Sequence, residues 1–214
     1  MKALITGFDP FGGADVNPAL EVVKRLEGVR VGDVEIVTRE IPTVRGKAIE
    51  ALVKAIQEEQ PSLVIAVGQA GGRMEMTPER VAINVDDFRI ADNEGNQVVD
   101  EAIVAGGPAA YWSTLPIKKI VAALREEGIP SSVSNTAGTF VCNHLFYGLM
   151  HYLQQEGAGR RGGFIHIPYL PKQAAQLPGQ PSMALSLLEK GLLVAIKVAL
   201  ENHEDERLGG GSIC

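Results

Sequence analysis

The stretch Leu63-Val64-Ile65-Ala66-Val67 is apolar at every position. A strand with one face in water alternates apolar and polar residues, whereas a strand covered on both faces of its sheet does not. Both faces are covered when helices connect parallel strands. The stretch therefore predicts a buried strand in the sheet of an α/β domain.

Other apolar runs of strand length lie on both sides of this stretch, and segments with helical spacing of apolar residues separate them. The predicted strands are 2–6, 34–41, 63–67, 81–85 and 164–167. The predicted helices are 18–26, 44–59, 116–127, 142–155 and 182–202, with Pro18 and Pro116 in first turns and Ser182 as an N-cap. This alternation predicts a single three-layer α/β/α domain over residues 1–202, with a mostly parallel, twisted sheet. Residues 203–214, rich in glycine, are expected to form a flexible tail.

The composition is that of an ordinary globular domain, with 45% hydrophobic and 21% charged residues in a chain of 214. A formal net charge of −6 leaves no broad basic surface, which argues against nucleic acid and anionic membranes as partners. The sequence has no apolar run of about 18 residues, as a membrane span requires, and no signal-peptide core at its start. We expect a cytoplasmic protein, in which Cys142 and Cys214 stay separate thiols.

Two segments, 91–111 and 168–181, interrupt the alternation with polar, turn-rich or proline-rich sequence. Segments of this kind usually form a protruding arm or a loop over a functional site. We expect the first to be a protruding arm, and either segment to shape a pocket or a contact between subunits.

Glycine-rich turns follow two of the predicted strands, at 7–13 and 68–72. The first lacks the Lys-Ser/Thr pair of a P-loop, and the second lacks the spacing of a dinucleotide-binding fingerprint. Tight turns at strand ends, where open α/β sheets bind ligands, explain both better. A nucleotide-binding module or an oxidoreductase remains an alternative from a different class of function.

Cys142 follows the polar turn 135–140, at the start of a predicted helix. The positive end of the helix dipole favours the thiolate there, and the thiolate is the attacking species in nucleophilic catalysis. The alternative is a buried thiol that only fills space. Cys214, on the glycine tail, has nothing near it in sequence that would activate it.

A thiolate nucleophile needs a base, and the chain has four histidines. His166 ends a predicted strand, where α/β sheets place their sites, although a hydrogen-bonded core histidine is the alternative. His144 would turn away from Cys142 on a helix and is expected to cap or pack locally, while His151 lies too far along that helix. His203 is expected on the surface. Cys142 and His144 have no further ligands at a zinc spacing, so no structural zinc site is expected.

A carboxylate is needed third, to fix the orientation of the imidazole ring. Glu79 lies between the second glycine turn and the apolar run 81–85. Glu75 and Asp86 are its rivals, and the alternative for each of the three is a solvated surface position. Glu79 is the first choice because of its place beside that run.

Together these residues resemble the type I pyroglutamyl peptidases, also called pyrrolidone-carboxylate peptidases, over nearly the whole chain to about residue 202. The motifs that carry the resemblance are Leu4-Ile5-Thr6-Gly7-Phe8-Asp9-Pro10-Phe11-Gly12 with Asn17-Pro18, Gly68-Gln69-Ala70-Gly71-Gly72-Arg73, Glu79-Arg80-Val81-Ala82-Ile83-Asn84, Asp92-Asn93 with Gly95, Ser134-Asn135-Thr136-Ala137-Gly138-Thr139-Phe140-Val141-Cys142-Asn143, and Phe164-Ile165-His166-Ile167-Pro168.

The resemblance implies a catalytic triad of Cys142 as nucleophile, His166 as base and Glu79 as the residue that orients the histidine. These are also the residues that the chemical argument ranks first. The implied reaction releases an N-terminal pyroglutamyl residue from a peptide through a thioester, without a metal or cofactor. A catalytically silent peptide-binding or assembly protein is the remaining alternative, and the intact triad argues against it.

The pyroglutamyl group is a small, flat, uncharged lactam, and a site for it needs apolar walls with a few amide partners. The resemblance implies both, together with an oxyanion site formed by the Cys142 N–H and Arg89. The implied walls are Phe8, Phe11, Ile90, Phe140 and Val141, and the implied polar partners are Asn17 and Gln69.

Phe88 and Ala91 depart from the family pattern, which leaves the shape of the segment before the arm open. The resemblance also implies a homotetramer, with the arm 91–111 as a contact between subunits.

Overall fold

The computed structural model describes residues 1–156, 159–207 and 209–210, which form one six-stranded sheet flanked by helices and a separate two-stranded sheet. The strands are β1 (Lys2–Phe8), β2 (Arg30–Val31), β3 (Val34–Ile41), β4 (Leu63–Gln69), β5 (Thr77–Pro78), β6 (Val81–Ile83), β7 (Ala110–Trp112) and β8 (Arg161–Ile167). The helices are α1 (Pro18–Lys24), α2 (Lys47–Glu59), α3 (Ile117–Glu126), α4 (Val141–Glu156), α5 (Pro171–Ala174) and α6 (Leu185–Glu201).

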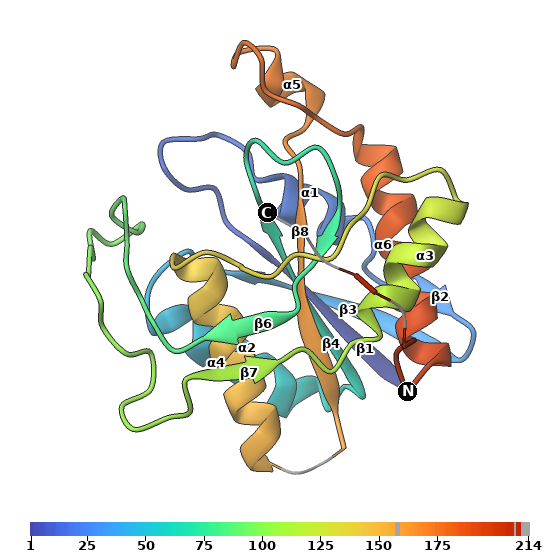
Figure 1. The fold of residues 1–214 in the computed structure, drawn as a ribbon, viewed down its shortest axis with the longest axis horizontal. Coiled ribbons are helices and arrows are strands. Elements are labelled where there is room, and N and C mark those ends of the chain that lie inside the picture. The colour runs from blue at the N-terminus through green and yellow to red at the C-terminus, as the bar shows by residue number, and fades with distance from the viewer. Residues whose placement is uncertain (157–158, 208, 211–214) are drawn as a thin grey trace.

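The main sheet has the order β2-β3-β1-β4-β8-β5, and its four inner strands are parallel (Figure 1). The edge strands β2 and β5 are antiparallel to their neighbours. The predicted mostly parallel sheet is therefore confirmed.

The predicted strand 81–85 does not belong to this sheet, which corrects the expectation that it continues the parallel alternation. Its first part, β6, pairs antiparallel with β7 in the separate sheet. The strand ends at Ile83 because the Asn84 side chain bonds Val104 N and O, which ties the chain to the arm. Only Ala82 is fully buried in β6, so this run of apolar residues covers a surface and does not cross the core.

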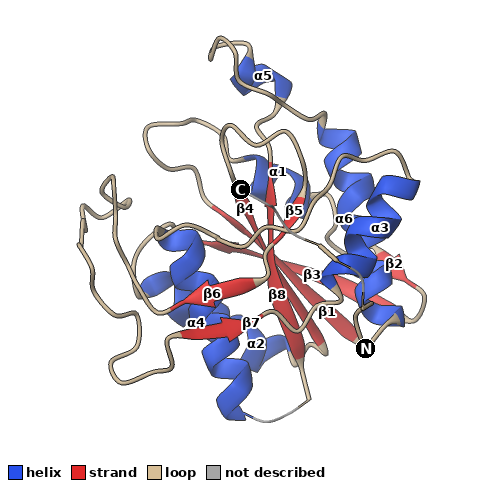
Figure 2. Cartoon of the chain, in the orientation of Figure 1, coloured by secondary structure: helices blue, strands red, loops and turns tan. Residues whose placement is uncertain are grey.

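Helices cover both faces of the main sheet, in the three layers that the sequence predicts (Figure 2). Residues 63–67 in β4 are completely buried, as the all-apolar stretch indicates. Ile65 and Val67 pack in the core with α1, α3 and α6. Val64 and Ala66 pack in the second core, with α2 and α4. No helix in the described ranges is long and apolar enough to cross a bilayer.

Helix starts follow the predictions in part. Pro18 opens α1, and the Asn17 side chain caps it by accepting from Ala19 N at 3.0 Å. Pro116 immediately precedes α3 as its N-cap. Ser182 is not an N-cap: α6 begins three residues later, because Ser182 pairs with Tyr169 in an isolated β-bridge.

The arm protrudes from the domain, whereas part of the tail is bound to the start of α3. The arm 91–111 extends from the body as a long excursion without helix, as predicted (Figure 1). In the tail, the Asp205 carboxylate accepts from Lys118 N and Lys119 N at 3.1 Å, at the start of α3. Cys214 lies outside the described residues, and the flexibility of the tail stays a prediction.

Gly7, near the end of β1, allows the strand to lie directly against α1. A Cβ at Gly7 would come within 2.8 Å of the carbonyl carbon and oxygen of Ala19, which are main-chain atoms and cannot rotate away. We expect Gly7→Ala to lower the free energy of unfolding by about 2–3 kcal/mol, measured by urea denaturation.

Gly209→Ala is the matched control, because a Cβ there meets nothing within 4 Å. Adding Ala19→Gly should not rescue Gly7→Ala, since the contacted atoms remain. Equal stability of Gly7→Ala and the wild type would contradict this account of the strand–helix contact.

Candidate active site

A cavity of about 470 Å³ opens at the carboxyl ends of β4 and β8, beside the start of α4. Open α/β sheets bind ligands at this edge, because loops and helix starts surround the ends of the parallel strands there. Both Cys142 and His166 line the cavity. The arrangement brings together the predicted nucleophile and the predicted base, which are far apart in sequence.

Gly68 lets the nucleophile approach the sheet. It pairs with His166 across the β4–β8 ladder, so the two residues lie side by side on neighbouring strands. A Cβ at Gly68 would lie 3.0 Å from Cys142 Sγ and 2.7 Å from Phe164 Cζ. The missing side chain therefore leaves the space into which the thiol projects, next to the strand that carries the imidazole.

Cys142 is the second residue of α4 and is partly exposed to the cavity. Burial of the thiol and, after it, the negative charge of Glu79 raise the pKa of Cys142 to about 12. Burial thus opposes the thiolate that the helix start was expected to favour. The side chain of Cys142 is therefore a neutral thiol at neutral pH.

His166 is held by a buried carboxylate. Its Nδ1–H donates to Glu79 Oε1 at 2.7 Å, with His166 4% and Glu79 0% exposed. Burial lowers the pKa of the imidazole, so the ring is neutral at rest, although Glu79 opposes this shift. With the proton on Nδ1, Nε2 has a lone pair that can accept a proton.

Glu79 stays ionised although burial by itself would raise the pKa of its carboxyl. The hydrogen bond from His166 and the positive charge of Arg73 hold that pKa below its ordinary value. Glu79 reaches this position because its N–H donates to Phe164 O at 2.9 Å, just beyond the β5–β8 pair. Because Thr77 pairs with His166 and Pro78 with Ile165, Glu79 lies opposite Phe164, two residues before His166 on β8.

Arg73 is a site residue that the sequence analysis did not single out. Its Nη1 donates to Glu79 Oε1 at 2.6 Å and to Thr77 Oγ1 at 2.7 Å. Its Nη2 donates to Thr136 O at 2.9 Å, in the turn that precedes α4. The only signal in the sequence was its place at the end of the 68–73 motif, which does not tell which carboxylate it meets.

The rival carboxylates, Asp86 and Glu75, occupy other places in the structure. Asp86 is completely buried and accepts from His144 Nδ1 at 2.9 Å and from Arg45 Nε at 2.8 Å. His144 Nε2 in turn accepts from Gly46 N at 2.9 Å. The expectation that His144 caps or packs locally is therefore wrong, because both of its partners lie far away in the sequence. Glu75 lies outside the cavity that holds Cys142.

The other two histidines, His151 and His203, also lie outside the cavity that holds Cys142. His151 Nδ1 lies 2.8 Å from the Tyr111 hydroxyl. His203 is exposed. Within residues 1–156, 159–207 and 209–210, no group of three or more His, Cys, Asp or Glu side chains is placed to hold a metal ion.

Three of the five apolar residues proposed as walls line the cavity: Phe11, Ile90 and Phe140. The rings of Phe11 and Phe140 lie 5.9 Å apart, and Phe88 packs edge-on behind Phe140 at 4.8 Å. Phe88, which departs from the family pattern, is thus a buried support for the wall. Two residues are not brought to the surface of the cavity, because they are buried in the core behind it: Phe8 and Val141.

Of the polar residues expected to contact the substrate, some line the cavity and one does not. Gln69 lines the cavity, and its Oε1 accepts from Gln173 Nε2 at 2.9 Å, which leaves the Gln69 NH₂ group available. Asn17 does not line the cavity, because its amide caps α1 and donates to Asp9 O at 3.0 Å. Arg89 lines the cavity and is exposed, and its guanidinium makes no hydrogen bond or ion pair with the described residues.

The known proteins that are similar to this chain share one family name. The model of the pyroglutamyl peptidase family matches residues 1–202. Pyrrolidone-carboxylate peptidases of Bacillus mycoides and Klebsiella pneumoniae are 58% and 60% identical over 209 residues, covering 98% of this chain and 97% of each relative.

Solved structures agree with these relatives. Pyroglutamyl peptidase I from Bacillus amyloliquefaciens superposes with a TM-score of 0.95 at 55% identity, covering 97% of this chain and 99% of that one. A mutant pyrrolidone carboxyl peptidase from Pyrococcus furiosus gives 0.91 at 45% identity, covering 94% and 99%. Because the family model spans nearly the whole chain and these relatives share its length and fold, the protein belongs to the pyroglutamyl peptidase family of cysteine-type hydrolases.

Proposed function

We propose that this protein removes an N-terminal pyroglutamyl residue from peptides, with Cys142 as nucleophile, His166 as general base and then acid, and Glu79 as the residue that positions His166. The observation that carries the proposal is the 2.7 Å bond between His166 and Glu79 at a cavity that also contains Cys142. Family membership supplies the substrate class.

The first step is attack by a neutral thiol. As Cys142 Sγ bonds to the pyroglutamyl carbonyl carbon, its proton passes to His166 Nε2, and Glu79 stabilises the imidazolium that forms. The first N–H groups of α4 have no carbonyl partner within the helix, and the N–H of Cys142 is one of them. This group and Arg89 would stabilise the negative charge that develops on the carbonyl oxygen.

The second step expels the peptide and frees the enzyme. His166 returns its proton to the leaving nitrogen as the carbon–nitrogen bond breaks, which leaves a thioester on Cys142. Water then attacks the thioester while His166 again accepts a proton, and pyroglutamate leaves with the thiol restored. Every proton in this cycle passes through one imidazole, so its orientation by Glu79 matters in each step.

The lactam ring would lie between Phe11 and Phe140, with Ile90 closing the apolar wall. The Gln69 NH₂ group would donate to the ring carbonyl, because Gln173 already occupies the Gln69 oxygen. A site built this way prefers an amide-containing ring to the saturated proline ring, since the polar group would otherwise stay unpaired.

Two features stay expectations that the family resemblance and the sequence support. They are a homotetramer with the arm 91–111 as a contact between subunits, and a location in the cytoplasm.

Replacing the nucleophile tests the proposal directly. We expect Cys142→Ala to abolish release of the fluorophore from a pyroglutamyl amide, because no thioester can form. The matched control is Cys214→Ala, which removes the other thiol of the chain and should keep full activity. Normal release by Cys142→Ala, in a protein that folds like the wild type, would refute the proposed nucleophile.

The dependence of kcat/KM on pH should be sigmoidal. The reactive form needs a single proton on the Cys142–His166 pair, and burial lowers the pKa of His166 below its ordinary value of 6.5. The rate therefore falls with acidification only below about pH 6.5. The high pKa of Cys142, about 12, predicts a plateau without decline up to about pH 9.

The apparent pKa values of this pH profile are those of the coupled pair Cys142 and His166, and neither value is assigned to one residue alone. Glu79→Gln removes a group that raises the pKa of His166, so its acid limb should move to lower pH while kcat falls. A wild-type optimum near pH 6 with a steep alkaline decline would contradict a neutral resting pair.

Gln173 is expected to set the direction of the Gln69 amide. In Gln173→Glu the new carboxylate can only accept, so Gln69 should turn its NH₂ away from the cavity and present its oxygen to the ring carbonyl. We expect KM to rise about tenfold with little change in kcat, the effect of one misplaced hydrogen bond.

Gln176→Glu is the matched control, because it adds the same charge in the same segment at an exposed side chain without a hydrogen bond among the described residues. Equal KM values for the two variants would show that Gln173 does not control Gln69.

A further inference from the structure

A second cavity, of about 430 Å³, adjoins the one that holds Cys142. Two segments form it, residues 72–77 after the glycine turn and residues 132–136 before α4. Arg73 lines both cavities and is thus the wall that they share. We call the second cavity the outer groove.

The order of residues tells which end of a substrate would reach the outer groove. The apolar end of the catalytic cavity is formed by Phe11, Ile90 and Phe140, where the pyroglutamyl ring would lie. The leaving nitrogen must face His166, because this residue protonates it. The two cavities meet along residues 71–73 and 136–138, and Phe11, Ile90 and Phe140 line only the catalytic cavity, so the outer groove extends the site away from its apolar end, on the leaving side.

The charge of the outer groove is unbalanced. The guanidinium of Arg73 is neutralised by Glu79, and its other donors bond Thr77 and Thr136. Glu75 lines the groove and is partly exposed, and its carboxylate has no ion pair or hydrogen bond in the described part of the chain. Of the two charged residues that line the groove, Arg73 is therefore neutralised and Glu75 is not.

The rim of the groove suits a long cationic side chain. Met74, next to Glu75, is 67% exposed and lines the groove with a flexible apolar side chain. Lysine and arginine place an apolar stem on such a surface while the charged end reaches a carboxylate.

We propose that the outer groove binds the leaving peptide and that Glu75 makes the enzyme prefer lysine or arginine at the first or second residue after the scissile bond. This inference rests on the proposed function, because it assigns the second half of that substrate.

The test compares kcat/KM for short pyroglutamyl peptides that carry either lysine or glutamate at each of these positions, at physiological salt. We expect the wild type to prefer the lysine peptide about two- to fivefold at one of the two positions, the size of an exposed ion pair. Glu75→Gln should remove most of this preference, and Glu75→Lys should reverse it. None of these changes should alter cleavage of a pyroglutamyl amide with a neutral fluorophore, which has no peptide to fill the groove.

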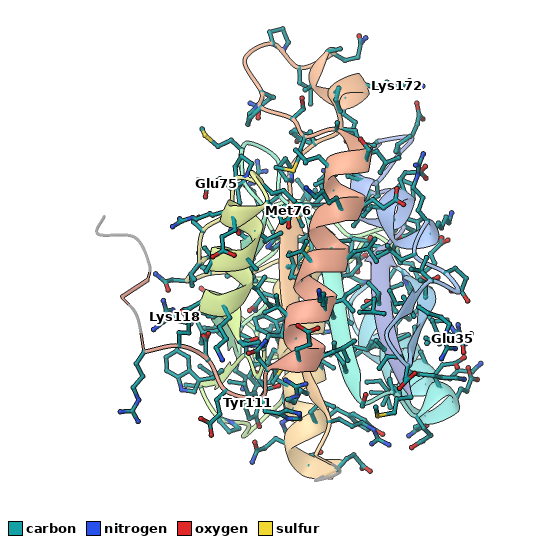
Figure 3. The ribbon with its side chains drawn as sticks, turned by 90° about the vertical axis from the view of Figure 1, so that its right-hand side faces the viewer. Glu35, Glu75, Met76, Tyr111, Lys118 and Lys172 are labelled. Atoms are coloured by element: carbon teal, nitrogen blue, oxygen red, sulfur yellow. The ribbon has the colours of Figure 1, made fainter. Side chains whose placement is uncertain are left out.

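The matched control is Glu35→Gln. Glu35 is a partly exposed carboxylate without a hydrogen bond or ion pair in the described ranges, and it lies on the opposite side of the molecule from Glu75 (Figure 3). The same change of net charge at this position should leave the preference intact, because salt screens charges beyond about 8 Å.

The inference is overturned if Glu75→Gln and Glu75→Lys keep the wild-type ratio, or if Glu35→Gln lowers it as much as Glu75→Gln does. Failure of the proposed function looks different, because then the wild type cleaves neither the peptides nor the neutral amide.

Discussion

The rest of the site depends on one buried charge, the carboxylate of Glu79. An ionised carboxylate without contact to water is costly unless it is paired and hydrogen-bonded. Glu79 Oε1 accepts from His166 at 2.7 Å and from Arg73 at 2.6 Å. These three residues come from the end of β8, the turn after β4 and the segment after β5. The need to compensate this charge therefore ties three parts of the sheet edge together.

The ion pair of Glu79 with Arg73 also links His166 to the segment that carries Cys142. Arg73 also donates to Thr136 O, in the turn from which α4 and Cys142 begin. A displacement of Arg73 would thus disturb the orientation of His166 and the position of the thiol. Arg73 also lines both cavities, so its displacement would change the wall between them.

The strands of the main sheet and the three residues that meet at the cavity could be predicted because their signals are local. An all-apolar run identifies a buried strand, and the motif around Cys142 combines a polar turn with a helix start. The predictions were wrong where the local structure depends on pairing with a segment far away in the sequence. Ser182 has the right chemistry for an N-cap but pairs with Tyr169 instead, and the run 81–85 pairs with β7 outside the main sheet.

The sequence by itself determined the layered α/β fold, the family and the choice of Cys142, His166 and Glu79, because each depends on periodicity or on short contiguous motifs. Only the tertiary structure decided the ionisation of the site, since the pKa of Cys142 depends on how much water its neighbours exclude. It also decided which proposed wall residues reach the cavity and which two side chains, Arg73 and Gln173, hold Glu79 and Gln69 in place. These are contacts between segments far apart in the chain, and sequence spacing carries no record of the direction in which a side chain points once the segments have packed.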